Sequence, residues 1–155
     1  MMSVEKVRAY FAGYGIENRV LEFHSSSATV ELAAIALNCE PARIAKTLSF
    51  KLKDRVILIV FAGDTKVDNA KYKAEFGEKA KMLDFGEVES LIGHAVGGVC
   101  PFGVNEGVVT YLDESLKRFD IVYPACGTSN SAIGLSVDEL EKISEAVGFV
   151  DVGKN

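Results

Sequence analysis

Cysteine and proline are both scarce in this sequence. The three cysteines, Cys39, Cys100 and Cys126, are odd in number and form no CxxC pair. That usage favours reduced thiols in a cytosol over disulfides or a zinc site. Only 3 prolines and no low-complexity tract occur, which argues against a disordered or fibrous chain. We therefore expect a globular cytoplasmic protein without a metal or other cofactor.

Long apolar segments are absent as well. The longest apolar run, Val56–Ala62, is far shorter than the roughly 20 residues that a membrane helix needs. Residues 1–14 lack the apolar stretch of a signal peptide. Neither membrane insertion nor secretion is expected.

The chain is also short of positive charge. It carries 17 Lys+Arg against 22 Asp+Glu, a net charge of −5, whereas proteins that grip long stretches of phosphate backbone usually present a basic face. An extended nucleic-acid interface is therefore not expected. Contact with a single nucleic-acid end stays open, because a few local cations can serve it. Either such a basic patch or an ordinary solvated helix face would account for Lys71, Lys73, Lys79 and Lys81.

What is present is enough for one folded domain over residues 1–155. With 155 residues, 48% of them hydrophobic, the chain should bury roughly 70% of the surface that its unfolded form exposes. A polar loop is expected at 24–27. Apolar spacing and helix caps predict helices at 3–14, 29–37, 68–76, 86–92 and 136–147. Apolar runs predict strands at 19–23, 46–52, 56–62, near 82, and at 108–112, 119–123 and 131–135.

These elements predict an α/β domain. The strands at 46–52 and 56–62 are separated only by Lys53, Asp54 and Arg55, which is a hairpin-length connection. Several other connections lack the dozen or more residues that a parallel crossover requires. We therefore expect a mixed, largely antiparallel sheet flanked by helices.

Lys46 is the most informative single residue. In a strand its side chain would share a face with Leu48, Phe50 and Leu52. The side chain of Lys46 would therefore leave the strand on its apolar face. A lysine in such a place commonly extends its ammonium to water. Alternatively, a partly desolvated ammonium at the mouth of a pocket could bind a phosphate or a carbonyl oxygen, or could itself react if its pKa is lowered.

A second informative segment is 97–103, which reads Gly-Gly-Val-Cys-Pro-Phe-Gly. This composition predicts a loop of unusual backbone shape. From Gly98 to Gly103 it has the spacing of a P-loop, but Val104 and Asn105 replace the residues that contact phosphate and Mg²⁺, so nucleotide hydrolysis is not expected. Its backbone N–H groups could instead hold a carbonyl oxygen or an oxyanion, although a purely structural turn fits the same residues.

The histidines suggest two weaker possibilities. Cys100 follows His94 by six residues and could be a nucleophile with its base, but a half-buried thiol is the commoner role. His24 precedes three serines and could form part of a polar pocket wall, although a surface loop is the default for such a residue.

Three features of the sequence occur in a familiar order: Lys46 at a strand start, the loop at 97–103, and the turn Cys126-Gly127-Thr128-Ser129-Asn130 before residues 133–140. In this order they resemble the YbaK family of aminoacyl-tRNA deacylases, which is related to the insertion domain of bacterial prolyl-tRNA synthetase. The resemblance covers the chain from about His24 to Leu140. It implies a single domain with a strongly curved mixed sheet flanked by helices. It also implies a trans-editing hydrolase that works without a metal and removes a wrong amino acid from the 3′ end of a tRNA.

The same resemblance implies roles for individual residues. Lys46 would help to hold the terminal nucleotide or the aminoacyl group, and the loop at 97–103 would place backbone donors on the scissile carbonyl. In the family the terminal ribose hydroxyl of the substrate assists the attacking water, so the protein mainly orients the substrate. The candidate catalytic residues are Lys46, Gly98, Val99 and Cys100. The candidate substrate-binding residues are His24, Gly97, Pro101, Phe102, Gly103, Gly127, Thr128, Ser129 and Asn130.

The identity of the amino acid stays open at this point. Many relatives have Ser or Thr at the position of Cys100, and several carry an extra glycine or arginine in the turn at 127–130. Substrates of the Cys-tRNA(Pro) or Ala-tRNA(Pro) type are implied, and proline analogues are not excluded. The expected partners are the acceptor end of a mischarged tRNA and an aminoacyl-tRNA synthetase. The alternative is a non-catalytic module that binds an amino-acid-like ligand or a protein partner.

Overall fold

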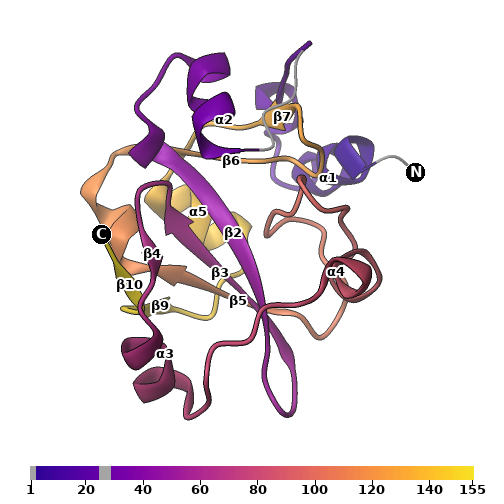
Figure 1. Ribbon diagram of the computed structural model, residues 1–155. Coiled ribbons are helices and arrows are strands. Elements are labelled where there is room, and N and C mark those ends of the chain that lie inside the picture. Colours follow the sequence, from indigo (N-terminus) through magenta and orange to yellow (C-terminus); the bar gives the residue numbers. More distant parts are fainter. Residues whose placement is uncertain (1–2, 25–28) are drawn as a thin grey trace.

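A computed structural model describes residues 3–24 and 29–155 (Figure 1). Residues 25–27 of the expected polar loop lie outside these ranges. None of the helices in the two ranges is long and apolar enough to cross a membrane. The α-helices are α1 (Ser3–Ala12), α2 (Val30–Leu37), α3 (Asn69–Phe76), α4 (Phe85–Ile92) and α5 (Val137–Ile143), and the short 3-10 helices are η1 (Glu17–Arg19), η2 (Pro41–Arg43) and η3 (Glu114–Arg118). The strands are β1 (Leu21–Glu22), β2 (Ile44–Lys51), β3 (Val56–Ala62), β4 (Lys66–Val67), β5 (Val109–Asp113), β6 (Ile121–Pro124), β7 (Ser131–Ala132), β8 (Leu135–Ser136), β9 (Phe149–Val150) and β10 (Gly153–Lys154).

The main sheet has the strand order β8-β6-β2-β3-β5-β9. The β2–β3 hairpin is antiparallel from Ala45 opposite Ala62 to Lys51 opposite Val56, and β6–β8 is also antiparallel. The pairs β2–β6, β3–β5 and β5–β9 are parallel. The mixed α/β sheet is thus confirmed. Parallel pairing is more frequent in this sheet than expected, because these pairs join strands that are distant in the sequence, where short connections impose no limit.

Both faces of the β2–β3 hairpin are covered. Side chains alternate between the two faces of a strand, and on one face Ala45 packs in a cluster with Phe11 of α1. On the other face Phe50 packs in a cluster with Tyr72 of α3. Because β3 is buried on both sides, its sequence Val56–Ala62 is continuously apolar instead of alternating.

Capping residues define the ends of three helices, and Asp68 and Ser136 are caps that the sequence predicted. The side chains of Thr29, Asp68 and Ser136 accept backbone hydrogen bonds at the starts of α2, α3 and α5. Asn38 and Gly77 end α2 and α3 in the left-handed region, with φ of 52° and 74°. The expected boundaries of these two helices are therefore confirmed.

Several other elements are shorter than expected. Helix α5 ends at Ile143 instead of 147, and Glu145 then takes a left-handed φ of 57°, which a continuing helix does not allow. The expected strand at 131–135 is divided into β7 and β8. The expected strand at 19–23 becomes η1 followed by β1, α1 ends at Ala12, and Met82 forms a single bridge to Phe50.

The start of α5 is joined to η1 by an ion pair. Arg19 Nη1 donates to Glu139 Oε2 at 2.8 Å, and Glu139 Oε1 accepts from the backbone N–H of Ser136 at 2.9 Å. The hydrogen bond from Arg19, followed by that from Ser136, lowers the pKa of Glu139 from 4.5 to about 2. The ionised form of Glu139 therefore stabilises the fold at neutral pH.

We expect the Glu139→Gln variant to be less stable than the wild type at pH 7. A lowered pKa gives a stabilisation that is complete above about pH 4.5 and is lost as the pH falls toward 2. The difference between the two proteins in urea-unfolding midpoint should therefore shrink between pH 5 and pH 2. Glu141→Gln removes a charge from the same helix and serves as the control. If both variants showed the same pH dependence of the urea-unfolding midpoint, the stabilising role of ionised Glu139 would be contradicted.

Candidate functional site

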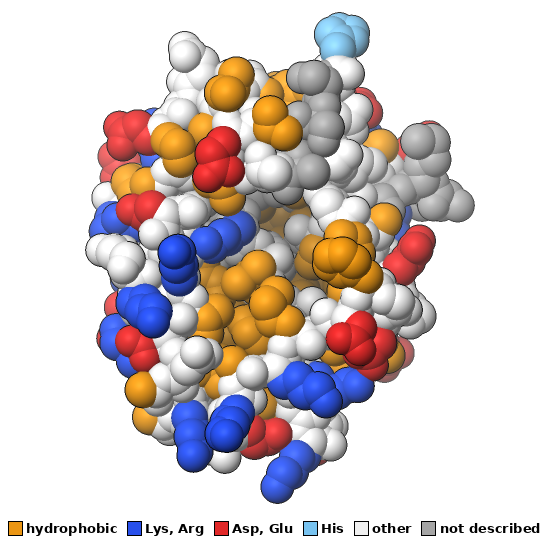
Figure 2. Space-filling view, viewed as in Figure 1, with side chains coloured by type: hydrophobic (Ala, Val, Ile, Leu, Met, Phe, Trp, Pro, Cys, Tyr) orange, Lys and Arg blue, Asp and Glu red, His pale blue; other side chains and the backbone are white. Residues whose placement is uncertain are grey.

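A cavity of about 340 Å³ opens beside β2, and Figure 2 shows a hollow with hydrophobic side chains on its floor and rim. A mostly apolar cavity of this size with a few polar groups is typical of a small-molecule site. Five parts of the chain form its walls: the start of α2 (Thr29, Val30, Ala33), β2 (Ile44, Ala45, Lys46, Thr47, Leu48, Ser49), the approach to α4 (Met82, Leu83, Phe85, Val88), the glycine-rich loop (Val96, Gly97, Val99), and the region from β6 to β7 (Tyr123, Ala125, Ser131, Ala132).

The cavity lies at a gap in the sheet along one edge of β2. On this edge β6 pairs only with Ile44 and Ala45. Farther along, the N–H of Leu83 donates to the carbonyl of Ser49 at 3.3 Å. Backbone groups of a strand alternate between its two edges, so the N–H and C=O of Thr47 point into the gap. The cavity is therefore bordered by the peptide groups of an open strand edge.

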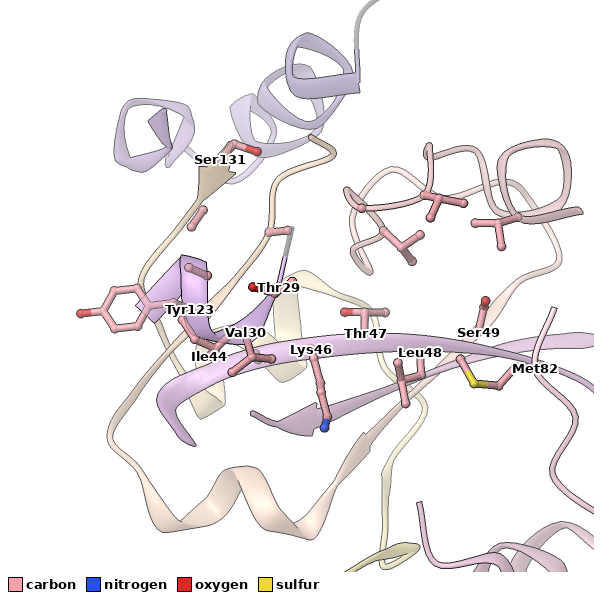
Figure 3. A pocket seen from close by; sticks show the side chains of 18 of the residues that line it. Thr29, Val30, Ile44, Lys46, Thr47, Leu48, Ser49, Met82, Tyr123 and Ser131 are labelled. Atoms are coloured by element: carbon pink, nitrogen blue, oxygen red, sulfur yellow. The ribbon is translucent and has the colours of Figure 1, made fainter. Parts of the chain in front are cut away.

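The two faces of β2 contribute different side chains to the cavity. Figure 3 shows Thr47 and Ser49 leaving the strand on one face, and Lys46 and Leu48 leaving it on the other. The first face carries the core cluster that includes Cys100 of the glycine-rich loop, and the second carries the cluster against which Leu48 packs. Thr47 Oγ1 is buried and has no hydrogen-bond partner among the described residues. An unpartnered hydroxyl thus lies on the loop side of β2.

Lys46 lines the cavity but does not face the glycine-rich loop across it. Its Nζ donates to the carbonyl of Gly63 at 3.5 Å, on the α3 face of the strand. Burial lowers the pKa of Lys46, and the nearby Asp64 carboxylate opposes that shift. Lys46, Gly97 and Val99 line the same cavity. The ammonium of Lys46 and the loop lie on opposite faces of β2, because side chains alternate along the strand.

The glycine-rich loop is held against the turn at 127. A Cβ atom on Gly98 would lie 2.5 Å from the carbonyl carbon and oxygen of Gly127, so only glycine fits there. The N–H of Gly98 donates to the carbonyl of Ala95 at 3.0 Å. This bond occupies the donor that was expected to serve a ligand. Gly97 and Val99 are the loop members that line the cavity next to it.

Buried side chains support the loop from behind. The rings and thiols of His94, Cys100 and Phe102 are completely buried. His94 Nε2 lies 2.6 Å from the carbonyl oxygen of Phe102, which assigns the proton to Nε2 as donor. Cys100 Sγ lies 3.5 Å from the same nitrogen.

The arrangement does not suit a nucleophile and its base. Because His94 Nε2 already donates to a carbonyl, it has no lone pair for the thiol proton. Burial raises the pKa of Cys100 to about 12 and lowers that of His94. A catalytic thiol needs a lowered pKa and access to substrate. These observations argue against a nucleophilic Cys100, and the buried residue packs the loop.

The remaining candidate residues lie around the cavity without lining it. His24 is exposed. Phe102 packs edge-on against Phe11 at 4.7 Å between ring centroids. Pro101 and Gly103 instead line a second cavity, behind the loop.

The turn at 127–130 holds a neighbouring residue in position at the cavity. Gly127 has a φ of 92°, and Ser129 lies in the same turn. Thr128 Oγ1 donates to Ser131 Oγ at 2.7 Å, and Asn130 Nδ2 donates to the carbonyl of Phe23 at 2.9 Å. The turn therefore positions Ser131, which does line the cavity.

Sequence reasoning missed several lining residues. Thr47 and Ser49, on the face of β2 opposite Lys46, were given no role in the sequence analysis. Alternation along the strand was the signal that could have found them. No pattern indicated Met82, Phe85 or Val96, because their place at the cavity depends on how distant segments meet.

These features define a small α/β domain with a cavity at an open strand edge beside a glycine-built loop. The sequence model of the aminoacyl-tRNA editing domain matches residues 24–143. The chain belongs to this family, whose members edit aminoacyl-tRNA. Lys46, the cavity walls and the turn at 127–130 all lie inside the matched segment.

Two kinds of relatives agree with this assignment. The chain is 51% identical over 155 residues to the uncharacterized protein YwhH of Bacillus subtilis, covering 99% of each protein. It is 30% identical over 121 residues to a proline–tRNA ligase of a Geobacillus species, covering 76% of this chain but only 21% of that enzyme. The similarity to the ligase is therefore confined to a part of it.

Solved structures show the same fold. A candidate trans-editing enzyme for prolyl-tRNA synthetase superposes with a TM-score of 0.89 at 28% identity, covering 99% of this chain and 98% of that one. The hypothetical protein APE2540 superposes with a TM-score of 0.86 at 29% identity, covering 96% and 99% of the two chains. The curved mixed sheet implied by the sequence resemblance is thus confirmed.

We expect Gly98→Ala to destabilise the protein by about 1 to 3 kcal/mol, because the new methyl group would overlap the Gly127 backbone. Thermal unfolding measures this loss. Gly86→Ala is the matched control, since a Cβ there meets nothing within 4 Å and Gly86 lies inside α4. That variant should gain about 0.5 to 1 kcal/mol. A Gly98→Ala protein as stable as Gly86→Ala would refute the packing described.

Proposed function

We propose that the protein is a cytoplasmic, trans-acting aminoacyl-tRNA deacylase that removes a wrongly attached amino acid from the 3′ end of a tRNA. The observation that carries the proposal is the position of the cavity within the segment that matches the editing family. Water would add to the ester carbonyl, the bond to the ribose oxygen would break, and that oxygen would take up a proton. Free amino acid and uncharged tRNA are the products.

The cavity supports this reaction by orienting the substrate. The ammonium of Lys46 at one edge is suited to the terminal ribose or phosphate oxygens. The open edge at Thr47 and the loop at Gly97 and Val99 offer peptide groups that could bind the aminoacyl carbonyl and amine. Positioning of this kind can contribute several kcal/mol without a nucleophilic side chain. As the resemblance implies, the ribose hydroxyl of the substrate would then assist the water.

The walls favour a small side chain on the amino acid. Next to the open edge of β2, the cavity is lined by Ala125, Ala132 and Val99, with few polar groups. An apolar wall built from small residues suits the side chain of alanine or cysteine. We therefore propose Ala-tRNA(Pro) or Cys-tRNA(Pro) as the substrate type. Similarity to a segment of proline–tRNA ligase supports tRNA(Pro), and the ligase itself is a proposed partner.

The charge of the protein suits a contact limited to the acceptor end. A net charge of −5 disfavours a long interface with phosphate backbone. Lys46 supplies a cation at the cavity itself. Further recognition of the tRNA would then be left to a few local lysines or to the synthetase partner.

A panel of mischarged tRNAs tests the proposal. Purified protein should release the amino acid from at least one small-residue tRNA(Pro) substrate, and Lys46→Ala should lower the rate roughly 10²-fold. Lys53→Ala is the control, because Lys53 is exposed just beyond the other end of β2. A protein that instead protects every ester from spontaneous hydrolysis would be a binding module, and the proposed activity would be wrong.

Cys100→Ala should keep deacylation within about threefold of the wild type. The thiol is buried behind the loop and does not line the cavity. Its loss should cost about 1 to 2 kcal/mol of stability through a small void. Both quantities are measured on the same preparation, by deacylation rate and by urea unfolding. Loss of activity with retained stability would instead indicate a cysteine hydrolase.

A further inference from the structure

Three apolar side chains stand out of the surface at the mouth of the cavity. Phe85 is 81% exposed, Met82 is 52% exposed and Val96 is 49% exposed, and all three line the cavity. We call these three residues the apolar lip. Scattered exposed apolar residues are ordinary, but a group gathered at a binding cavity marks an interaction site. Figure 2 shows hydrophobic side chains on both sides of the hollow.

Phe85 is presented by a well-defined helix start. It is the first residue of α4, and Asp84 caps the helix. The N–H of Asp84 donates to Glu87 Oε1 at 3.2 Å, which completes a capping box. Glu87 is also bonded to Lys51 Nζ at 2.7 Å, which links α4 to β2. The ring is therefore exposed on an anchored backbone, as a stacking surface requires.

The charged residues around the lip suit a ligand that carries phosphate groups and flat aromatic rings. Lys81 directly precedes Met82 and is exposed, and Lys46 lies at another edge of the cavity. The two acids nearest to Phe85 are engaged, Asp84 in the helix cap and Glu87 in the cap and the ion pair with Lys51. Unpaired nucleotides combine a phosphate backbone with bases that stack on aromatic rings.

We propose that Phe85 is a stacking platform for a base among the unpaired nucleotides at the 3′ end of the substrate. This inference rests on the proposed function, because an ester bound in the cavity brings its own nucleotide to the mouth. Met82 and Val96 would enclose the base at its edges. Stacking on an aromatic ring is tolerant of base identity, so the platform adds affinity for any acceptor end. Discrimination between amino acids stays with the cavity.

The first test measures binding of the unacylated trinucleotide cytidylyl-cytidylyl-adenosine by NMR titration. Phe85→Ala should weaken its binding roughly 5-fold to 100-fold, and Phe85→Trp should retain it. Leu91→Ala is the matched control, because Leu91 is a partly exposed apolar residue of the same helix that does not line the cavity. Equal binding of the trinucleotide by the wild type and by Phe85→Ala would overturn the proposal, even if the lip were then found to contact a protein.

A second measurement separates this inference from the proposed function. With a mischarged tRNA, Phe85→Ala should raise KM more than it lowers kcat, while hydrolysis of an alanyl ester of methyl riboside, which keeps the ribose hydroxyl but has no base, should fall much less. An equal loss on both substrates would mean damage to the cavity and would overturn the stacking role. If the wild type deacylates no tRNA, the proposed function fails, and the trinucleotide titration still decides whether Phe85 binds a base.

Discussion

The incomplete pairing of one edge of β2 is the constraint on which the site depends. Strand β6 leaves this edge after Ala45, and the segment before α4 joins it only from Ser49 to Lys51. Unpaired peptide groups of a strand need partners from solvent or from a ligand. The gap at Thr47 therefore gives the largely apolar cavity a polar edge, and among the described lining residues none on the loop side is charged.

The glycine-rich loop completes the cavity because it is fixed from two directions. In front, Gly98 packs against the backbone of Gly127 so closely that no side chain fits. Behind, the buried ring of His94 donates to the carbonyl of Phe102. A loop held in this way keeps its peptide groups in place before a ligand arrives, which lowers the reorganisation needed for binding. The same packing explains why Cys100 is inert.

The proposed function assigns different roles to the interior and to the mouth of the cavity. Under the proposed function, the apolar interior of the cavity would select the amino-acid side chain, whereas Lys46 and the lip around Phe85 would contact the nucleotide. Lys46 stands on the α3 face of β2 and the loop stands on the other. A ligand that touches both must cross the strand edge, and an aminoacyl ester joined to a ribose is long enough to do so.

Local patterns predicted the hairpin of β2 and β3, the caps at Asp68 and Ser136 and the loop at 97–103, because each depends on residues close together in the chain. The order of such local features along the sequence indicated the family. The parallel pairs of the sheet, the gap at Thr47 and the inert burial of Cys100 were decided only by the tertiary structure. So was the direction of the Lys46 ammonium relative to the loop. Such features depend on which distant segments meet, and hydrophobic periodicity carries no information about that choice beyond which face of an element is buried.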